Sequence, residues 1–219
     1  MNRFPLRPFV VFALLAGVLA VRDAGAGPPV LWHRFDIGTA RSLPWSDSNE
    51  WWKGDPAYDI QRLVADTEAL LTPSMPIVVR METLRRAAVY ASLDTAVAER
   101  LLARVRARVD HARRVSDNSG LASFDAAYLM ATLRQISELA HEAQFRDRAR
   151  RVQPLSGLAE ADAHLKDALA RRPADPALAF AAAIILAGRD TAASRAHAEA
   201  ARRGLGGAAL VAANIDHLH

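Results

Sequence analysis

The sequence predicts an all-α protein: antiparallel helical hairpins stacked as a short α-solenoid, with an irregular N-terminal segment. Apolar residues recur at three- and four-residue steps over most of the chain beyond residue 55. Turn-forming residues interrupt this pattern at short intervals, and alanine is frequent, as in the run 180–187. Such spacing places apolar side chains on one helix face, and short connections make sequential helices antiparallel neighbours. Small side chains then let the helix axes approach closely.

The composition is that of an ordinary globular protein. Of 219 residues, 51% are hydrophobic and 24% are charged, and none is cysteine. This balance excludes an acidic or low-complexity disordered chain. The absence of cysteine excludes a disulfide scaffold and any catalytic, zinc or iron–sulfur site built on thiolates.

The first 26 residues have the layout of a secretory signal peptide. Arg3 and Arg7 precede an apolar run over 9–21, and Ala24-Gly25-Ala26 offers small residues for cleavage. A membrane-spanning helix needs about 20 apolar residues, which favours cleavage after Ala26 over an uncleaved anchor. We therefore expect an exported protein, periplasmic or secreted, with no permanent membrane span after cleavage. Export also argues against a nucleic-acid partner.

The remaining chain divides into two zones of different composition. Residues 27–54 are rich in turn formers and contain all four tryptophans, and we expect them to form an irregular segment. Residues 55–219 form the predicted helical-hairpin domain. Asp55-Pro56 marks its start, because an Asp side chain caps a first turn and Pro fits the first helical position.

Eight helices are expected in this domain. The apolar stripe is clearest in the third, where Val97, Leu101, Val105 and Val109 recur at four-residue steps. The fourth repeats it with Leu129, and residues 116–120 form a turn cluster before it. Residues 145–154 form a charged link. The predicted ranges are 56–71, 76–92, 94–114, 121–144, 156–171, 176–187, 190–203 and 206–217.

Residues 158–204 carry the spacing of a repeat. Small, large, small and proline residues follow one another at Ala161, Leu165, Ala168 and Pro173. Asp175-Pro176 then opens a helix containing Ala183, a turn follows at 188–190, and the spacing returns at Ala193, His197 and Ala200 before Gly204.

This spacing resembles the tetratricopeptide repeat, over about one and a half repeats. The chain departs from the family in lacking an aromatic-rich first helix and in placing His197 where a large apolar residue is usual. No pattern matching the family's carboxylate clamp is present. The resemblance implies stacked hairpins with a concave face on which an extended peptide or a helix docks.

The tryptophan-rich segment offers one candidate contact surface. Trp45, Trp51 and Trp52 could form an exposed aromatic platform for a sugar ring or a peptide. They could instead pack over the first hairpin and cap the end of the stack. Neighbouring Trp51 and Trp52 cannot both point inward from one extended segment, so the platform remains open as an alternative.

A second candidate surface is the arginine cluster of the charged link. Only Asp147 offsets its charge, so it could attract an acidic partner segment or an anionic lipid head. A solvated linker is the alternative. The cluster consists of Arg146, Arg148, Arg150 and Arg151.

The sequence contains no recognisable catalytic, cofactor or metal motif. The seven histidines are scattered, and no phosphate loop, dinucleotide fingerprint or nucleophile elbow is present. Acidic residues lie within amphipathic helices, where ion pairs with arginine account for them. Glu82 with Arg85 and Arg86 has the i,i+3 and i,i+4 spacing of such a pair on a solvated face.

We therefore expect a non-enzymatic protein without catalytic, cofactor-binding or metal residues. Its expected role is a scaffold in the cell envelope that binds a protein or peptide partner. The alternative is a carbohydrate-binding or enzyme-accessory protein that uses Trp45, Trp51 and Trp52. An enzyme with carboxylates hidden among the helices is a third hypothesis.

Overall fold

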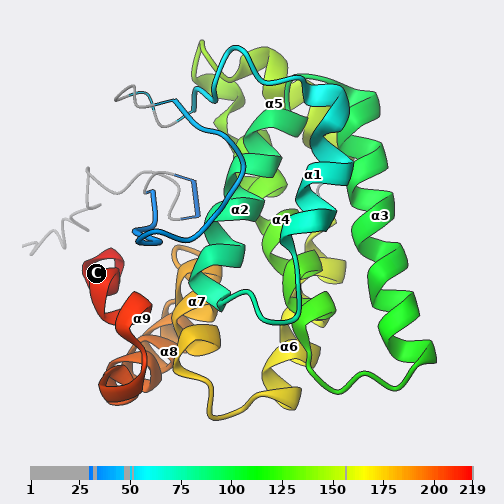
Figure 1. Cartoon of the computed structure of the whole chain (residues 1–219). Helices are drawn as coiled ribbons and strands as arrows, with labels where there is room; N and C mark the ends of the chain where they lie inside the picture. The colour runs from blue at the N-terminus through cyan, green and yellow to red at the C-terminus, as the bar shows by residue number, and fades with distance from the viewer. Residues whose placement is uncertain (1–29, 32–33, 47–49, 51, 156, 219) are drawn as a thin grey trace, which may run out of the picture.

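The described residues are helical, as the sequence predicts. The computed structural model describes residues 30–31, 34–46, 50, 52–155 and 157–218, and this part contains no strand (Figure 1). The predicted signal peptide lies outside it. The helices are α1 (Leu63–Leu70), α2 (Ile77–Ala91), α3 (Thr95–Arg114), α4 (Leu121–Glu138), α5 (Arg146–Val152), α6 (Leu158–Arg171), α7 (Pro176–Leu186), α8 (Thr191–Arg203) and α9 (Ala209–Ala213).

Side-chain caps fix several helix starts where the sequence placed them. The carboxylates of Asp94, Asp175 and Asp190 accept hydrogen bonds from first-turn amides of α3, α7 and α8. Pro176 occupies the start of α7, where its missing N–H costs nothing. These three starts needed only local information, which is why the sequence located them.

The first predicted helix begins later than expected. Asp55 does accept from the Ala57 amide, but its own N–H donates to the Tyr90 hydroxyl on α2. This hydrogen bond holds the chain at Asp55 against α2. The helical path begins only after Asp59, which caps a short 3-10 turn (Ile60–Arg62) that leads into α1. The expected link at 145–154 likewise contains a separate helix, α5, between 3-10 turns at Leu139–His141 and Gln153–Leu155.

Helix α4 lies at the centre of the molecule and packs against α2, α3, α5 and α6. The sequence predicts one buried face for it, yet nearly every side chain from Leu121 to Ile136 is buried. Alanines at 126, 127 and 131 make this enclosure feasible, because small side chains let several neighbours approach. Gly120 immediately before it has a φ of 71°, and a Cβ there would lie 3.2 Å from Arg171 Cβ.

The C-terminal helices form a second group, in which α7 packs along α8 and also contacts α2 and α9. The small residues buried on α8 are Ala198 and Ala201, one position after His197 and Ala200 of the repeat spacing. The Ser194 hydroxyl helps set this rotation by donating to the Ala183 carbonyl of α7 at 2.8 Å.

The N-terminal segment lies across both groups of helices. In Figure 1 it runs beside α2, from the neighbourhood of α9 toward α5. Val30, Leu31, Phe35 and Leu43 are all buried within the main hydrophobic core. The described residues of the segment therefore cover the helices and have no regular secondary structure of their own.

Candidate functional site

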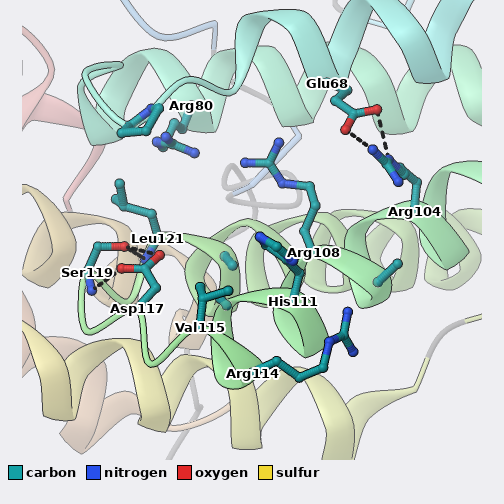
Figure 2. Close-up of a pocket in the computed structure, with 14 residues that line it drawn as sticks. Glu68, Arg80, Arg104, Arg108, His111, Arg114, Val115, Asp117, Ser119 and Leu121 are labelled. Carbon is teal, nitrogen blue, oxygen red and sulfur yellow. Dashed lines mark hydrogen bonds and ion pairs between the residues drawn. The ribbon is translucent and has the colours of Figure 1, made fainter.

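The described residues enclose an open pocket of about 740 Å³. It lies between the end of α1, the C-terminal half of α3 and the beginning of α4 (Figure 2). Ligand pockets typically measure about 300–1,000 Å³, so its size suits a ligand or a short segment of a partner. We call it the arginine pocket; its lining includes Glu68, Arg80, Arg104, Arg108, His111, Arg114, Val115, Asp117, Ser119, Leu121 and Ala122.

The loop between α3 and α4 shapes one wall of the arginine pocket. Ser116 has a φ of 53°, and the Asp117 carboxylate accepts from the amide and hydroxyl of Ser119 at 2.8 and 3.0 Å. These hydrogen bonds lower the pKa of Asp117, and the bond from the Ser119 amide has the larger effect. The loop delivers the first turn of α4 to the pocket. The Leu121 amide donates to the Ser119 hydroxyl at 3.3 Å, and the helix dipole favours negative charge there.

A buried ion pair forms the floor of the pocket. Arg80 Nη1 lies 2.8 and 2.7 Å from the two carboxylate oxygens of Asp125, and both side chains are at most 1% exposed. Burial raises the pKa of Asp125, and the two nearby arginines oppose that shift. The Arg80 guanidinium also donates to the carbonyls of Thr72 and Met75. Its charge is therefore largely satisfied within the protein.

Arg108 is held less completely. One of its terminal nitrogens donates to the Leu71 carbonyl at 2.9 Å and lies 3.6 Å from Asp125. Its Nε is buried and has no hydrogen-bond partner among the described residues. Its side chain is 24% exposed, so part of the guanidinium faces the open pocket.

The rim contains the remaining cations. Arg104 pairs with Glu68, and hydrogen bonds from Arg104 lower the pKa of that carboxylate. Arg114 and His111 are exposed on the same side of α3, and Arg114 has no ion-pair partner in the described part of the chain. Figure 2 shows Arg104, Arg108, His111 and Arg114 following one another along the helix. Among the described residues, the positive charge of the pocket that is not fully paired is therefore that of Arg114 and part of that of Arg108.

The side chains of the pocket that could take part in chemistry include Ser119, Asp117 and His111. Ser119 donates its hydroxyl hydrogen to Asp117, and His111 forms no hydrogen bond with either residue in the described structure. A nucleophile of this kind requires an adjacent general base. The described residues also contain no group of three histidine, aspartate or glutamate side chains placed to hold a metal ion.

Two of the three tryptophans proposed as a platform are packed against the helices. The Trp45 ring lies edge-on to Tyr90, with 5.5 Å between centroids, and the Arg85 guanidinium lies 4.8 Å from its centroid. Trp52 packs similarly against Phe145, with centroids 6.2 Å apart. Trp51 lies outside the described residues. The described tryptophans therefore support the capping interpretation, and the platform keeps only Trp51 as an untested member.

The four arginines of the predicted basic link lie on α5 and differ in their exposure. Arg146 is exposed, whereas Arg150 pairs at 3.4 Å with the exposed Asp147. Arg148 is half-buried and donates to the Trp52 carbonyl at 3.1 Å, and burial lowers its pKa. Arg148 thus fastens the N-terminal segment to α5, while Arg151 is half-buried.

Sequence reasoning missed the residues of the arginine pocket. Arg104, Arg108 and His111 have i,i+4 and i,i+7 spacing, which places them on one stripe of α3. This spacing indicates a cationic face on the helix and could have been recognised from the sequence. The contributions of Arg80 and Asp125 were not readable, because their burial depends on how α2 and α4 meet.

Comparisons with known proteins identify no relative: no family model, curated protein or solved structure matches the chain. None of the described helices is long and apolar enough to cross a membrane.

Proposed function

We propose that this protein is an exported, non-enzymatic helical scaffold of the cell envelope that binds an acidic segment of a protein or peptide partner. The observation that carries the proposal is the arginine pocket, an open cavity in which the guanidinium groups of Arg114 and Arg108 are not fully paired with carboxylates of the described residues. Guanidinium groups pair with carboxylates through planar, two-pronged hydrogen bonding. An acidic segment is therefore the partner class that this lining fits.

The electrostatics of the pocket favour a partner that brings charge rather than apolar surface. The carboxylates near the cavity are already engaged: Asp125 with Arg80, Glu68 with Arg104, and Asp117 with Ser119. The first turn of α4 adds the positive end of its dipole to the same space. An entering carboxylate would meet Arg108 and Arg114 without first displacing a buried ion pair.

The scaffold part of the proposal extends the resemblance to tetratricopeptide repeats. Helices α7 and α8 pack along each other, and small residues including Ala183 and Ala201 are buried in them, whereas α6 packs chiefly against α4. A Cβ on Gly204 would lie only 2.3 Å from Pro176, so the end of α8 approaches the start of α7 very closely. These contacts support a hairpin of α7 and α8 as the unit of the proposed stack, with earlier helices completing it.

Export remains a prediction from residues 1–26, which lie outside the described structure. Mass spectrometry of the protein recovered after expression with its full N-terminus tests it directly. A mature chain beginning at Gly27 is the expected result, and a chain that retains residues 1–26 in the membrane fraction would contradict it.

Two charge reversals of equal size test the pocket. Arg114→Glu changes an exposed pocket arginine, and Arg195→Glu changes an exposed arginine of α8 away from the pocket. Both alter the net charge by the same amount, so any difference between them reflects location. The probe is a fluorescein-labelled hexaglutamate peptide, titrated at low ionic strength and followed by fluorescence anisotropy.

We expect saturable binding that Arg114→Glu weakens about tenfold or more, because opposed like charges at an interface cost several kcal/mol. Arg195→Glu should change the affinity less than about twofold, since exposed charges beyond a Debye length are screened. Equal losses in the two variants would refute the proposal, as would an absence of saturable binding to the unmodified protein.

A further inference from the structure

The N-terminal segment is held on the helices largely through its main chain. We call residues 34–45 the strap. The Phe35 amide donates to Glu82 Oε2 at 3.2 Å, and Asn214 beside α9 both accepts from the Asp36 amide and donates to the Asp36 carbonyl. Farther along, Arg86 donates to the Leu43 carbonyl and the Tyr90 hydroxyl donates to the Pro44 carbonyl. Side chains that bind main-chain atoms recognise the path of a backbone rather than a particular sequence.

Three side chains of the strap anchor it between these hydrogen bonds. Phe35 is 3% exposed and lies edge-on to Phe180 of α7, with centroids 6.1 Å apart. Leu43 is 1% exposed, and Trp45 packs on Tyr90. The two apolar anchors flank a turn at 37–40, where the Ala40 amide donates to the Ile37 carbonyl at 3.1 Å and Gly38 has a φ of 58°. The strap is therefore a turned segment with main-chain contacts at both ends.

The surface beneath the strap is charged, which is unusual for a permanent core. Glu82 and Arg85 are both 0% exposed and meet at 2.8 Å, and Arg86 adds a second guanidinium at 2.7 Å from Glu82. Burying such charges carries a desolvation penalty that their attraction repays only in part. Lifting the strap would return water to all three groups and so offset some of the apolar contact that is lost.

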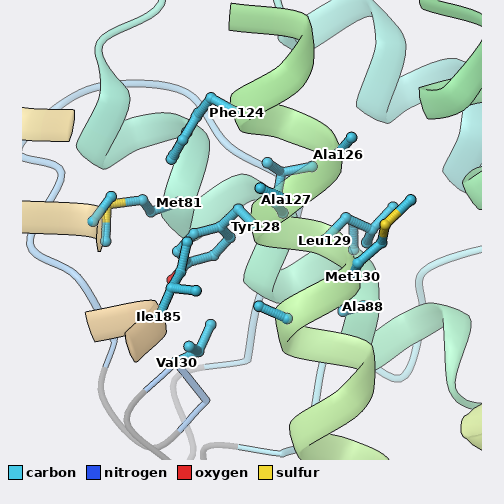
Figure 3. Close-up of a cluster of buried hydrophobic side chains, with 14 of the residues drawn as sticks. Val30, Met81, Ala88, Phe124, Ala126, Ala127, Tyr128, Leu129, Met130 and Ile185 are labelled. Carbon is cyan, nitrogen blue, oxygen red and sulfur yellow. The ribbon is translucent and has the colours of Figure 1, made fainter. Parts of the chain in front are cut away.

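The indole of Trp45 would also gain from opening, because Trp45 belongs to the strap. The indole Nε1 of Trp45 and the hydroxyl of Tyr128 are buried without hydrogen-bond partners among the described residues. Figure 3 shows Tyr128 close to Met81, Ile185 and Val30, where α2, α4, α7 and the N-terminal segment meet. A buried polar group without a partner is costly, and access to water removes that cost.

We infer that the faces of α2, α7 and α9 beneath the strap form a peptide site, and that the strap is its exchangeable occupant. The strap opens while the helices stay folded, and the vacated site accepts another peptide with an aromatic and an aliphatic anchor on either side of a turn. This site shares no side chain with the arginine pocket, and the inference does not rest on acidic-peptide binding there.

A reversible lock tests this exchange in the full-length protein. The hydroxyls of Ser42 on the strap and Thr83 on α2 are 3.0 Å apart, close enough for a disulfide after substitution. The chain contains no cysteine, so the S42C/T83C variant can form only this intramolecular bond. The probe is a fluorescein-labelled peptide with the sequence of residues 34–46, and the reduced protein is the matched control for the oxidised one.

A weakened resident strap makes exchange measurable, because an attached segment competes at millimolar effective concentration. Phe35→Ala, added to the lock variant, removes one anchor and leaves the helical side of the site intact. In the reduced state, we expect the F35A/S42C/T83C variant to bind the peptide about tenfold or more tightly than the S42C/T83C variant. Oxidation, which forms the disulfide, should abolish binding. Binding that is indifferent to oxidation, or undetectable in both redox states, would overturn the inference.

Hydrogen exchange on the unmodified chain gives a second test that needs no variant. If the strap opens alone, the amides of Phe35 and Asp36 exchange at least about tenfold faster than the slowest amides of α4. Exchange of these two amides only together with the α4 core would show a permanent structural layer and would also overturn the inference.

Discussion

Neutralising Glu82 is the sharpest perturbation of the buried charge beneath the strap. Burial alone would raise the pKa of Glu82, but the charges and hydrogen bonds of Arg85 and Arg86 outweigh burial and lower it. The same carboxylate also accepts from the Phe35 amide. Glu82→Gln keeps the shape of the side chain, removes its charge, and leaves one oxygen to serve three donor groups.

The expected cost follows from the geometry of this cluster. Removing one partner of a buried ion pair typically costs about 3–5 kcal/mol. Gln retains one acceptor oxygen, and Arg86 is 17% exposed and can turn partly to water, so we expect the lower end, about 3 kcal/mol. For a chain of this size, that loss lowers Tm by about 6–12 °C.

Asp125→Asn is the matched comparison. Asp125 is as fully buried as Glu82, but burial raises its pKa, whereas that of Glu82 is lowered. Loss of the charge at Asp125 should therefore cost less than the same change at Glu82. Urea unfolding followed by circular dichroism measures both, with an unchanged m-value as the check on two-state behaviour. An equal or greater loss for Asp125→Asn would refute this reasoning.

Two further predictions concern backbone geometry and pH. Gly120 and Gly188 have similar positive φ values of 71° and 75°, but of the two only Gly120 would bring an added Cβ within 4 Å of neighbouring atoms. Gly120→Ala should therefore lower the free energy of unfolding by about 2 kcal/mol and Gly188→Ala by about 1 kcal/mol, as measured by urea unfolding. Equal costs would show that α4 and α6 are not closely packed there. Because the pKa of Glu82 is lowered from an ordinary value of 4.5, its stabilisation is complete above about pH 4.5 and is lost as pH falls through the folded-state pKa. Unfolding midpoints between about pH 6 and pH 3 should therefore fall more steeply for the unmodified chain than for Glu82→Gln, and parallel curves would contradict this.

The sequence predicts features that depend on neighbouring residues. The predicted helix starts at Asp94 and Asp175 and the stripe beginning at Val97 are confirmed, because each depends on spacing between residues that are close in the sequence. The pairing of Glu82 with Arg85 and Arg86 is also confirmed, but its predicted location on a solvated face is wrong. Which face of a helix meets solvent depends on distant segments, here the strap.

The same distinction explains why the candidate sites were not predicted. The arginine pocket depends on the loop at 115–120 bringing the start of α4 beside α3, and on Asp125 reaching Arg80 from another helix. The strap depends on residues separated by nearly the whole chain, such as Asp36 and Asn214. The sequence shows periodic spacing only for the basic stripe on α3, and it shows none for the contacts between distant segments.

Helix α2 connects these two surfaces. Arg80 and Glu82 are two residues apart, which separates them by about 200° around the helix axis. One therefore faces α4 and the arginine pocket, and the other faces the strap. A slip of α2 by one residue would rotate it by about 100° and break both contacts together. Replacing either charge with an apolar residue would remove a desolvation cost, but it would also release one of the two constraints that hold α2 in a single register.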